Sequence, residues 1–147
     1  MDSRDQLMRW FDSNTGLWRN YWWQGASILT SFNDIAYLDE NVKNVYGATW
    51  EHVYNNAPAN RPYKMKRSKA KRESGFLNDF YDDEGWWALA WIGALDNTGR
   101  REYLDEAIAI WYDMNAGFNK PSCGGLPWKK DEGSGPLAIP NCTWFQR

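Results

Sequence analysis

Residues 80–90 read Phe-Tyr-Asp-Asp-Glu-Gly-Trp-Trp-Ala-Leu-Ala, so three consecutive acids directly precede a run of apolar residues. Residues 86–95 are apolar on almost every side of a helix, which predicts an inner helix that neighbours cover all around. Helix capping explains one acid, with Asp82 or Asp83 as the N-cap and Glu84 in the first turn. Capping does not explain why three acids occur in a row. The alternative interpretation is a pair of catalytic carboxylates.

The remaining helices follow mainly from apolar residues that recur every three or four positions. The predicted ranges are 3–11, 18–38, 42–53 and 104–114. No period-two alternation with turn signals is present, so the sequence predicts an all-α protein. Two long connections, 57–78 and 117–140, separate helices, and we interpret the basic run at 64–72 as a solvated loop.

The length of 147 residues corresponds to one ordinary domain, which is large enough to bury a core without disulfides or metals. We therefore expect a single domain over residues 1–147. The net charge of -2 gives no global electrostatic reason to expect a nucleic-acid partner. No apolar run approaches the roughly 20 residues that span a membrane, and residues 1–10 lack the hydrophobic stretch of a signal peptide.

Tryptophan and tyrosine are unusually frequent, with eleven and eight copies respectively. Their rings either fill a core or line a site that grips flat, partly apolar ligands such as sugars. Cys123 and Cys142 either form a disulfide or stay free thiols, and both alternatives are open. His52 stands alone and no His or Cys cluster has the spacing of metal ligands, so we expect neither a metal nor another cofactor.

Asp82 and Asp83 form a candidate catalytic pair for the hydrolysis of a glycosidic bond. In this chemistry one carboxylate attacks the sugar carbon while the other carboxyl group protonates the departing oxygen. Adjacent Cα atoms lie about 3.8 Å apart, so the two side chains can splay to the roughly 5 Å separation of a retaining mechanism. The N–H groups at the helix start favour an ionised nucleophile, whereas the neighbouring charge and the surrounding tryptophans keep the second acid protonated.

The stretch 81–92 strongly resembles the signature of glycoside hydrolase family 76. Further matches lie at 15–18, 22–23, 103–107 and 123–128. By this resemblance the fold is an (α/α)6 barrel of alternating outer and inner helices, Asp82 is the nucleophile, and Asp83 is the acid and base. The implied activity is retaining, endo-acting hydrolysis of α-1,6-linked mannan, with α-mannan or its oligosaccharides as the partner. The resemblance also implies a secreted or cell-surface protein.

The chain length limits how much of such a barrel is present. Twelve helices of roughly 11 residues with loops of about five need on the order of 190 residues. The predicted fold class is therefore an incomplete (α/α)6 barrel, the N-terminal part of the domain, with about five to six of twelve helices. An open half-ring leaves its inner helices partly uncovered.

Residues 137–141 depart from the family pattern, because Leu137 replaces an asparagine and Pro140 stands where a sixth helix should propagate. A truncated, non-catalytic fragment with at most weak binding of mannan oligosaccharides is therefore the alternative function. Another (α/α)6 sugar enzyme, such as an epimerase or an unsaturated uronyl hydrolase, is disfavoured by the paired aspartates.

The barrel topology predicts that the N-terminal ends of the inner helices meet on one face. Trp22 and Trp23 begin one such helix, the aspartate pair begins another, and a loop carries Trp128 toward a third. Trp22, Trp23, Tyr81 and Trp128 are therefore candidate sugar contacts. Core packing is the alternative for each of them.

Overall fold

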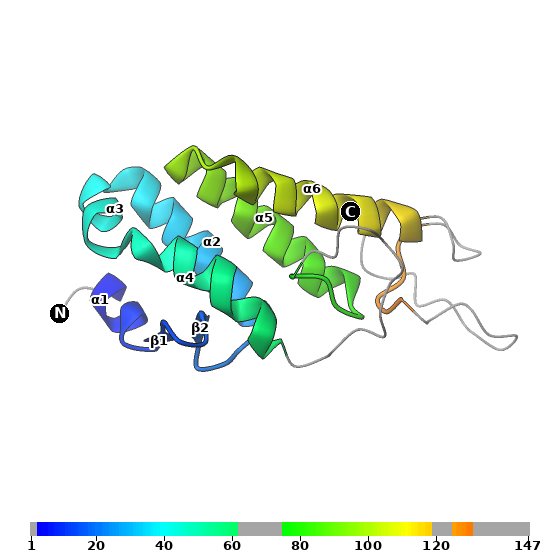
Figure 1. The fold of residues 1–147 in the computed structure, drawn as a ribbon, viewed down its shortest axis with the longest axis horizontal. Coiled ribbons are helices and arrows are strands. Elements are labelled where there is room, and N and C mark those ends of the chain that lie inside the picture. Colours follow the sequence, from blue (N-terminus) through cyan, green and yellow to red (C-terminus); the bar gives the residue numbers. More distant parts are fainter. Residues whose placement is uncertain (1–2, 62–74, 119–124, 131–147) are drawn as a thin grey trace, which may run out of the picture.

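The computed structural model describes residues 3–61, 75–118 and 125–130, which form an all-α fold with one short hairpin (Figure 1). The elements are α1 (Ser3–Met8), β1 (Phe11–Asp12), β2 (Leu17–Trp18), α2 (Trp23–Leu38), α3 (Glu40–Tyr46), α4 (Ala48–Asn56), the 3-10 helix η1 (Ala57–Asn60), α5 (Tyr81–Thr98) and α6 (Arg101–Gly117). The all-α fold class expected from the sequence is confirmed.

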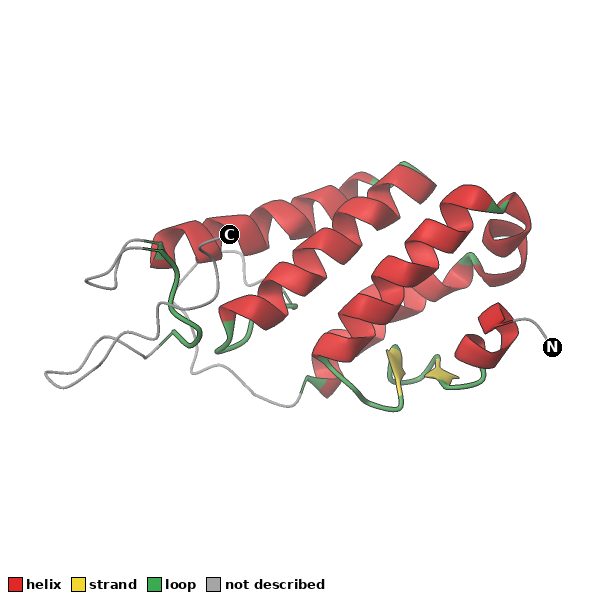
Figure 2. Ribbon diagram, turned by 180° about the vertical axis from the view of Figure 1, so that it is seen from behind, coloured by secondary structure: helices red, strands yellow, loops and turns green. Residues whose placement is uncertain are grey.

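The long helices α2 and α5 run parallel and pack along each other, as both ribbon views show (Figures 1 and 2). Helix α4 runs antiparallel to α2, and α6 packs antiparallel along α5. The N-terminal ends of α2 and α5 consequently lie at the same end of the molecule. This alternation of inner and outer helices is the arrangement expected for part of an (α/α)6 barrel. Among the described residues, no helix has the length and apolar character needed to cross a membrane.

The start of α2 differs from the prediction, because the helix expected from residue 18 begins only at Trp23. Trp18 instead pairs with Phe11 in the β1–β2 hairpin, which the sequence pattern did not reveal. Arg19 and Asn20 have φ values of 51° and 60°, so two consecutive left-handed residues follow the hairpin. These φ values are typical of a type I′ turn and are incompatible with a right-handed helix.

The helix predicted over 42–53 is two helices, α3 and α4, which meet at Gly47. The chain turns tightly there, and a Cβ atom on Gly47 would lie 2.5 Å from the Lys43 carbonyl oxygen. A glycine therefore permits the break. The sequence pattern does not reveal it, because helical periodicity is present on both sides of Gly47.

Aromatic side chains fill much of the core between the helices. The Phe76 ring lies 5.8 Å from Trp22, 4.7 Å from Trp87 and 4.9 Å from Trp91, measured between ring centroids. Trp18 is also buried, with 1% of its surface exposed. Part of the high tryptophan content is thus explained by packing, because large rings bury much apolar surface.

The described residues do not cover helix α5 on all sides, which corrects the expectation for residues 86–95. Trp87 and Trp91 are fully buried, whereas Trp86, Leu89 and Ile92 keep 46%, 56% and 44% of their surface exposed. These three residues follow each other at three-residue spacing and form one stripe along the helix. We call them the α5 stripe. An inner helix with one uncovered side is what an open half-ring was expected to show.

Several features of the sequence lie outside the described residues. They are the basic run at 64–72, the cysteines Cys123 and Cys142, and the segment 137–141 with Leu137 and Pro140.

Candidate active site

The first turn of α5 is fixed in place by the segment that carries Trp128. The backbone N–H of Tyr81 donates to the Trp128 carbonyl at 3.1 Å, and the backbone N–H of Lys130 donates to the Asp79 carbonyl at 3.0 Å. These two bonds align the segment antiparallel to the residues that precede the helix. Residues almost 50 positions apart are thereby brought to one end of α5.

None of the three acids is the N-cap, so the assignment of Asp82 or Asp83 as N-cap is wrong, whereas Glu84 does lie in the first turn as expected. The N-cap is Phe80, with φ of -122° and ψ of 119°, and it makes no side-chain capping bond. Asp82, Asp83 and Glu84 occupy the second to fourth helical positions. Acids in the first turn are still favoured by the helix dipole. Their side chains, however, bond to groups outside the helix.

The Asp82 carboxylate faces the Trp128 indole. Its Oδ2 atom accepts a hydrogen bond from Trp128 Nε1 at 3.0 Å. Its Oδ1 atom is shielded from solvent and accepts no hydrogen bond from any described residue. The Trp128 ring packs on Phe80 at a centroid distance of 5.0 Å and remains 43% exposed. An exposed aromatic ring thus lies next to a half-buried carboxylate.

The Asp83 carboxyl group lies in a drier environment, with 9% of the residue exposed. Its Oδ2 atom accepts a hydrogen bond from Asn78 Nδ2 at 2.6 Å. Burial, opposed by the Asn78 bond and aided by the neighbouring charge of Asp82, raises the pKa of Asp83 to about 6. Asp83 therefore holds a proton at mildly acidic pH, where an ordinary aspartate is ionised.

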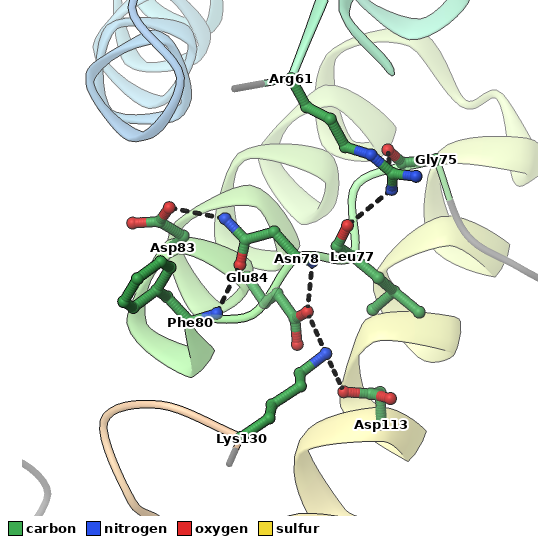
Figure 3. A network of polar contacts seen from close by, with 9 residues as sticks. All are labelled: Arg61, Gly75, Leu77, Asn78, Phe80, Asp83, Glu84, Asp113 and Lys130. Carbon is green, nitrogen blue, oxygen red and sulfur yellow. Dashed lines mark hydrogen bonds and ion pairs between the residues drawn. The ribbon is translucent and has the colours of Figure 1, made fainter. Parts of the chain in front are cut away.

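Glu84 is completely buried and lies in a polar network that reaches Asp83 through Asn78 (Figure 3). Its Oε1 atom accepts hydrogen bonds from the Asn78 backbone N–H at 2.6 Å and from Lys130 Nζ at 2.5 Å. Lys130 also forms an ion pair with Asp113 of α6, with 2.7 Å between Nζ and Oδ2. Burial raises the pKa of Glu84, and the Lys130 ammonium opposes this shift by favouring the ionised form.

Asn78 joins this network to the candidate pair. Its Oδ1 atom accepts from the Phe80 backbone N–H at 2.8 Å, while its Nδ2 atom donates to Asp83. An asparagine that bonds the N–H two residues ahead forms an Asx turn, and its place two residues before the N-cap was a usable sequence signal. The parts played by Lys130 and Asp113 had no such signal, because their partners are distant in the sequence.

The four candidate sugar contacts fall into two groups. Trp22 and Tyr81 are 3% and 4% exposed, and each packs inside the protein, which favours the packing alternative for both. Trp23 and Trp128 are 47% and 43% exposed and offer ring surface to a ligand. Sugar contact by any of the four remains a prediction.

An all-helical protein with two adjacent carboxyl groups in unequal environments at the start of an inner helix has the features of a carbohydrate-cleaving hydrolase. The model of glycosyl hydrolase family 76 matches residues 4–146, nearly the whole chain, and the chain belongs to this family. No curated protein and no solved structure gave a significant match. Membership of the family implies glycoside hydrolase activity on a carbohydrate substrate. No three His, Cys, Asp or Glu side chains among the described residues are placed to hold a metal ion.

Proposed function

We propose that this chain is a retaining, endo-acting hydrolase of α-1,6-linked mannan, with Asp82 as the nucleophile and Asp83 as the acid and base. The observation that carries the proposal is the difference between the two neighbouring carboxyl groups. Asp82 accepts an N–H bond from Trp128 at the start of a helix, whereas Asp83 is buried and has a pKa of about 6. Environments that separate the protonation states of two acids are typical of this chemistry.

In the proposed reaction, a carboxylate oxygen of Asp82 attacks the anomeric carbon of a mannosyl unit and forms a glycosyl ester. The Asp83 carboxyl group gives its proton to the glycosidic oxygen as the bond to the departing chain breaks. In the second step Asp83, now ionised, removes a proton from a water molecule, whose oxygen attacks the same carbon. This step releases Asp82 and gives back the proton to Asp83, so the net change is addition of one water.

Two features of the site support binding of a sugar next to these acids. The Trp128 ring is partly exposed while its N–H donates to Asp82, and Trp23 is similarly exposed at the start of the parallel helix α2. Aromatic faces suit sugar rings because they are flat and partly apolar. The linkage and the identity of the sugar are those that the family resemblance implies.

The test is an assay of the chain on linear α-1,6-mannan beside α-1,2- and α-1,3-linked mannans. We expect cleavage of the first substrate only, with internal products of mixed length. Replacing the nucleophile or the acid, in Asp82→Asn or Asp83→Asn, should lower kcat about 10³-fold or more. Asp96→Asn, which changes an exposed acid near the other end of α5, is the matched control and should keep full activity.

Two outcomes would contradict the proposal. Equal activity of Asp82→Asn and the unchanged chain would remove Asp82 from its role. Proton NMR of the first product distinguishes mechanisms, because an α-anomer indicates retention of configuration and a β-anomer indicates inversion.

A second candidate function is a non-catalytic fragment that binds mannan oligosaccharides weakly. The uncovered α5 stripe favours it, because an open half-ring lacks the walls of a closed cleft. Titration with mannan oligosaccharides, followed by tryptophan fluorescence, separates the two functions. Binding without any turnover would support the fragment, and turnover would exclude it.

A further inference from the structure

Lys130 occupies an unusual position for a lysine, since only 17% of its side chain is exposed. Its ammonium group lies between the fully buried Glu84 of α5 and Asp113 of α6. A buried carboxylate is costly unless it is paired and hydrogen-bonded. Lys130 therefore joins the two helices to the segment that carries it (Figure 3).

The first connection from Lys130 to the site runs along the backbone. Trp128 lies two residues before Lys130, and its indole N–H reaches Asp82. Backbone hydrogen bonds at Trp128 and at Lys130 hold the segment in place. The ion pair of the Lys130 side chain with Glu84 anchors it further. Loss of that anchor should let the Trp128 ring move away from Asp82.

The second connection runs through Glu84. The Glu84 Oε1 atom accepts hydrogen bonds from Lys130 Nζ and from the backbone N–H of Asn78. The Asn78 side chain in turn donates a hydrogen bond to Asp83. The Lys130 ammonium thus holds the carboxyl group whose Oε1 atom orients the backbone of Asn78. Charge-assisted hydrogen bonds of this kind are stronger and more directional than neutral ones.

We propose that Lys130 is a positioning residue that fixes both candidate catalytic carboxyl groups, Asp82 through Trp128 and Asp83 through Glu84 and Asn78. This inference rests on the proposed function for the role of the aspartates. It adds that the positions of the two aspartates depend on the ion pair between Lys130 and Glu84. Neither aspartate lies on the 126–130 segment that supplies Lys130.

The test compares Lys130→Met, which removes the charge at similar length, with Lys130→Arg, which keeps it. The first readout is the NMR signal of the Trp128 indole N–H, assigned through Trp128→Phe. We expect hydrogen exchange at this group to become at least about tenfold faster in Lys130→Met, because its bond to Asp82 weakens. Lys130→Arg should restore most of the protection.

The second readout is catalysis on α-1,6-mannan. Lys130→Met should lower kcat about 10- to 100-fold with little change in KM, since displacement of reacting groups by about 1 Å has effects of this size. The control is Lys43→Met, which removes a lysine charge from α3, away from the 126–130 segment, and leaves the Lys130 ion pairs in place (Figure 1). It should leave both readouts unchanged.

Asp113→Asn provides a milder second variant, because it weakens the anchor on α6 while Glu84 keeps its partner. It should change both readouts in the same direction by smaller amounts, and it carries the test if Lys130→Met fails to fold. Unchanged indole exchange in both variants would overturn the inference. An inactive wild-type chain would overturn the proposed function instead, since the indole readout needs no substrate.

Discussion

At the scale of single residues, the pKa of Asp83 is set by burial and by its hydrogen bond with Asn78. Its amide N–H favours the ionised carboxylate, whereas burial and the neighbouring Asp82 favour the protonated form. The result is a pKa of about 6 in the folded protein, against 3.8 for an ordinary aspartate. Because the folded protein binds this proton more tightly, the contribution of Asp83 to stability is complete below about pH 4 and is lost as the pH rises through about 6.

Asn78→Ala should therefore raise the pKa of Asp83 further, since it removes the one hydrogen bond that opposes the shift. A larger fraction of Asp83 stays protonated at each pH, so the alkaline limb of the pH–rate profile should move to higher pH. A carbon-13 NMR titration of the Asp83 carboxyl group measures the same change without substrate. The variant should also lose about 1–3 kcal/mol of stability, because the Phe80 N–H loses its acceptor.

Asn55→Ala, an exposed asparagine of α4, serves as the control and should leave the titration unchanged. An unchanged or lower pKa of Asp83 in Asn78→Ala would show that the amide does not act on the carboxylate as described.

At the scale of elements, a buried asparagine joins three helices. Asn33 of α2 donates through Nδ2 to the Ala90 carbonyl of α5 at 2.8 Å and accepts through Oδ1 from Trp50 Nε1 of α4 at 2.7 Å. The side chain fits because Gly93 faces it, and a Cβ atom on Gly93 would lie 2.7 Å from Asn33 Nδ2. The close approach of α2 and α5 thus depends on a glycine inside a helix.

Gly93→Ala should destabilise the protein by about 1–3 kcal/mol, because the added methyl group displaces Asn33 from its two partners. Gly85→Ala on the same helix is the matched control. A Cβ atom there would meet Met114 at an ordinary 3.5 Å, so the better helix propensity of alanine should stabilise the protein by up to about 1 kcal/mol. Urea unfolding measures both changes, and equal effects of the two substitutions would contradict the close packing of Asn33.

At the scale of the whole molecule, the described residues leave the α5 stripe exposed. Trp111 and Tyr112 of the adjacent helix α6 are 56% and 63% exposed as well. Exposed apolar surface on neighbouring helices promotes association because burying it is favourable.

We expect the chain to associate as its concentration rises, with Leu89 of the stripe contributing. Leu89→Gln should remove about 1.5 kcal/mol or more of apolar burial, which raises the dissociation constant about tenfold. Sedimentation velocity over a range of concentrations measures the change. Tyr37→Gln, at an exposed position near the end of α2, is the control, and equal effects of the two variants would show that association does not use the stripe.

The sequence alone determined the helical fold, the inner helix α5 and the position of the aspartate pair at its start. These features are local: helical periodicity and a cluster of acids before an apolar run are read within about 20 residues. The same locality explains the wrong start predicted for α2, because Trp18 has helical spacing to Trp22 although it lies in the hairpin, before the left-handed turn at Arg19 and Asn20.

Only the tertiary structure decided which aromatic rings are core and which are exposed, and how the two aspartates differ. Trp22 and Trp23 are neighbours in sequence, yet 3% of one and 47% of the other is exposed, because successive helical residues point in different directions. The partners of the acids, Trp128 and Lys130, are each 46 residues from the acid that they contact. Contacts over such distances follow from how the chain packs, and no local pattern encodes them.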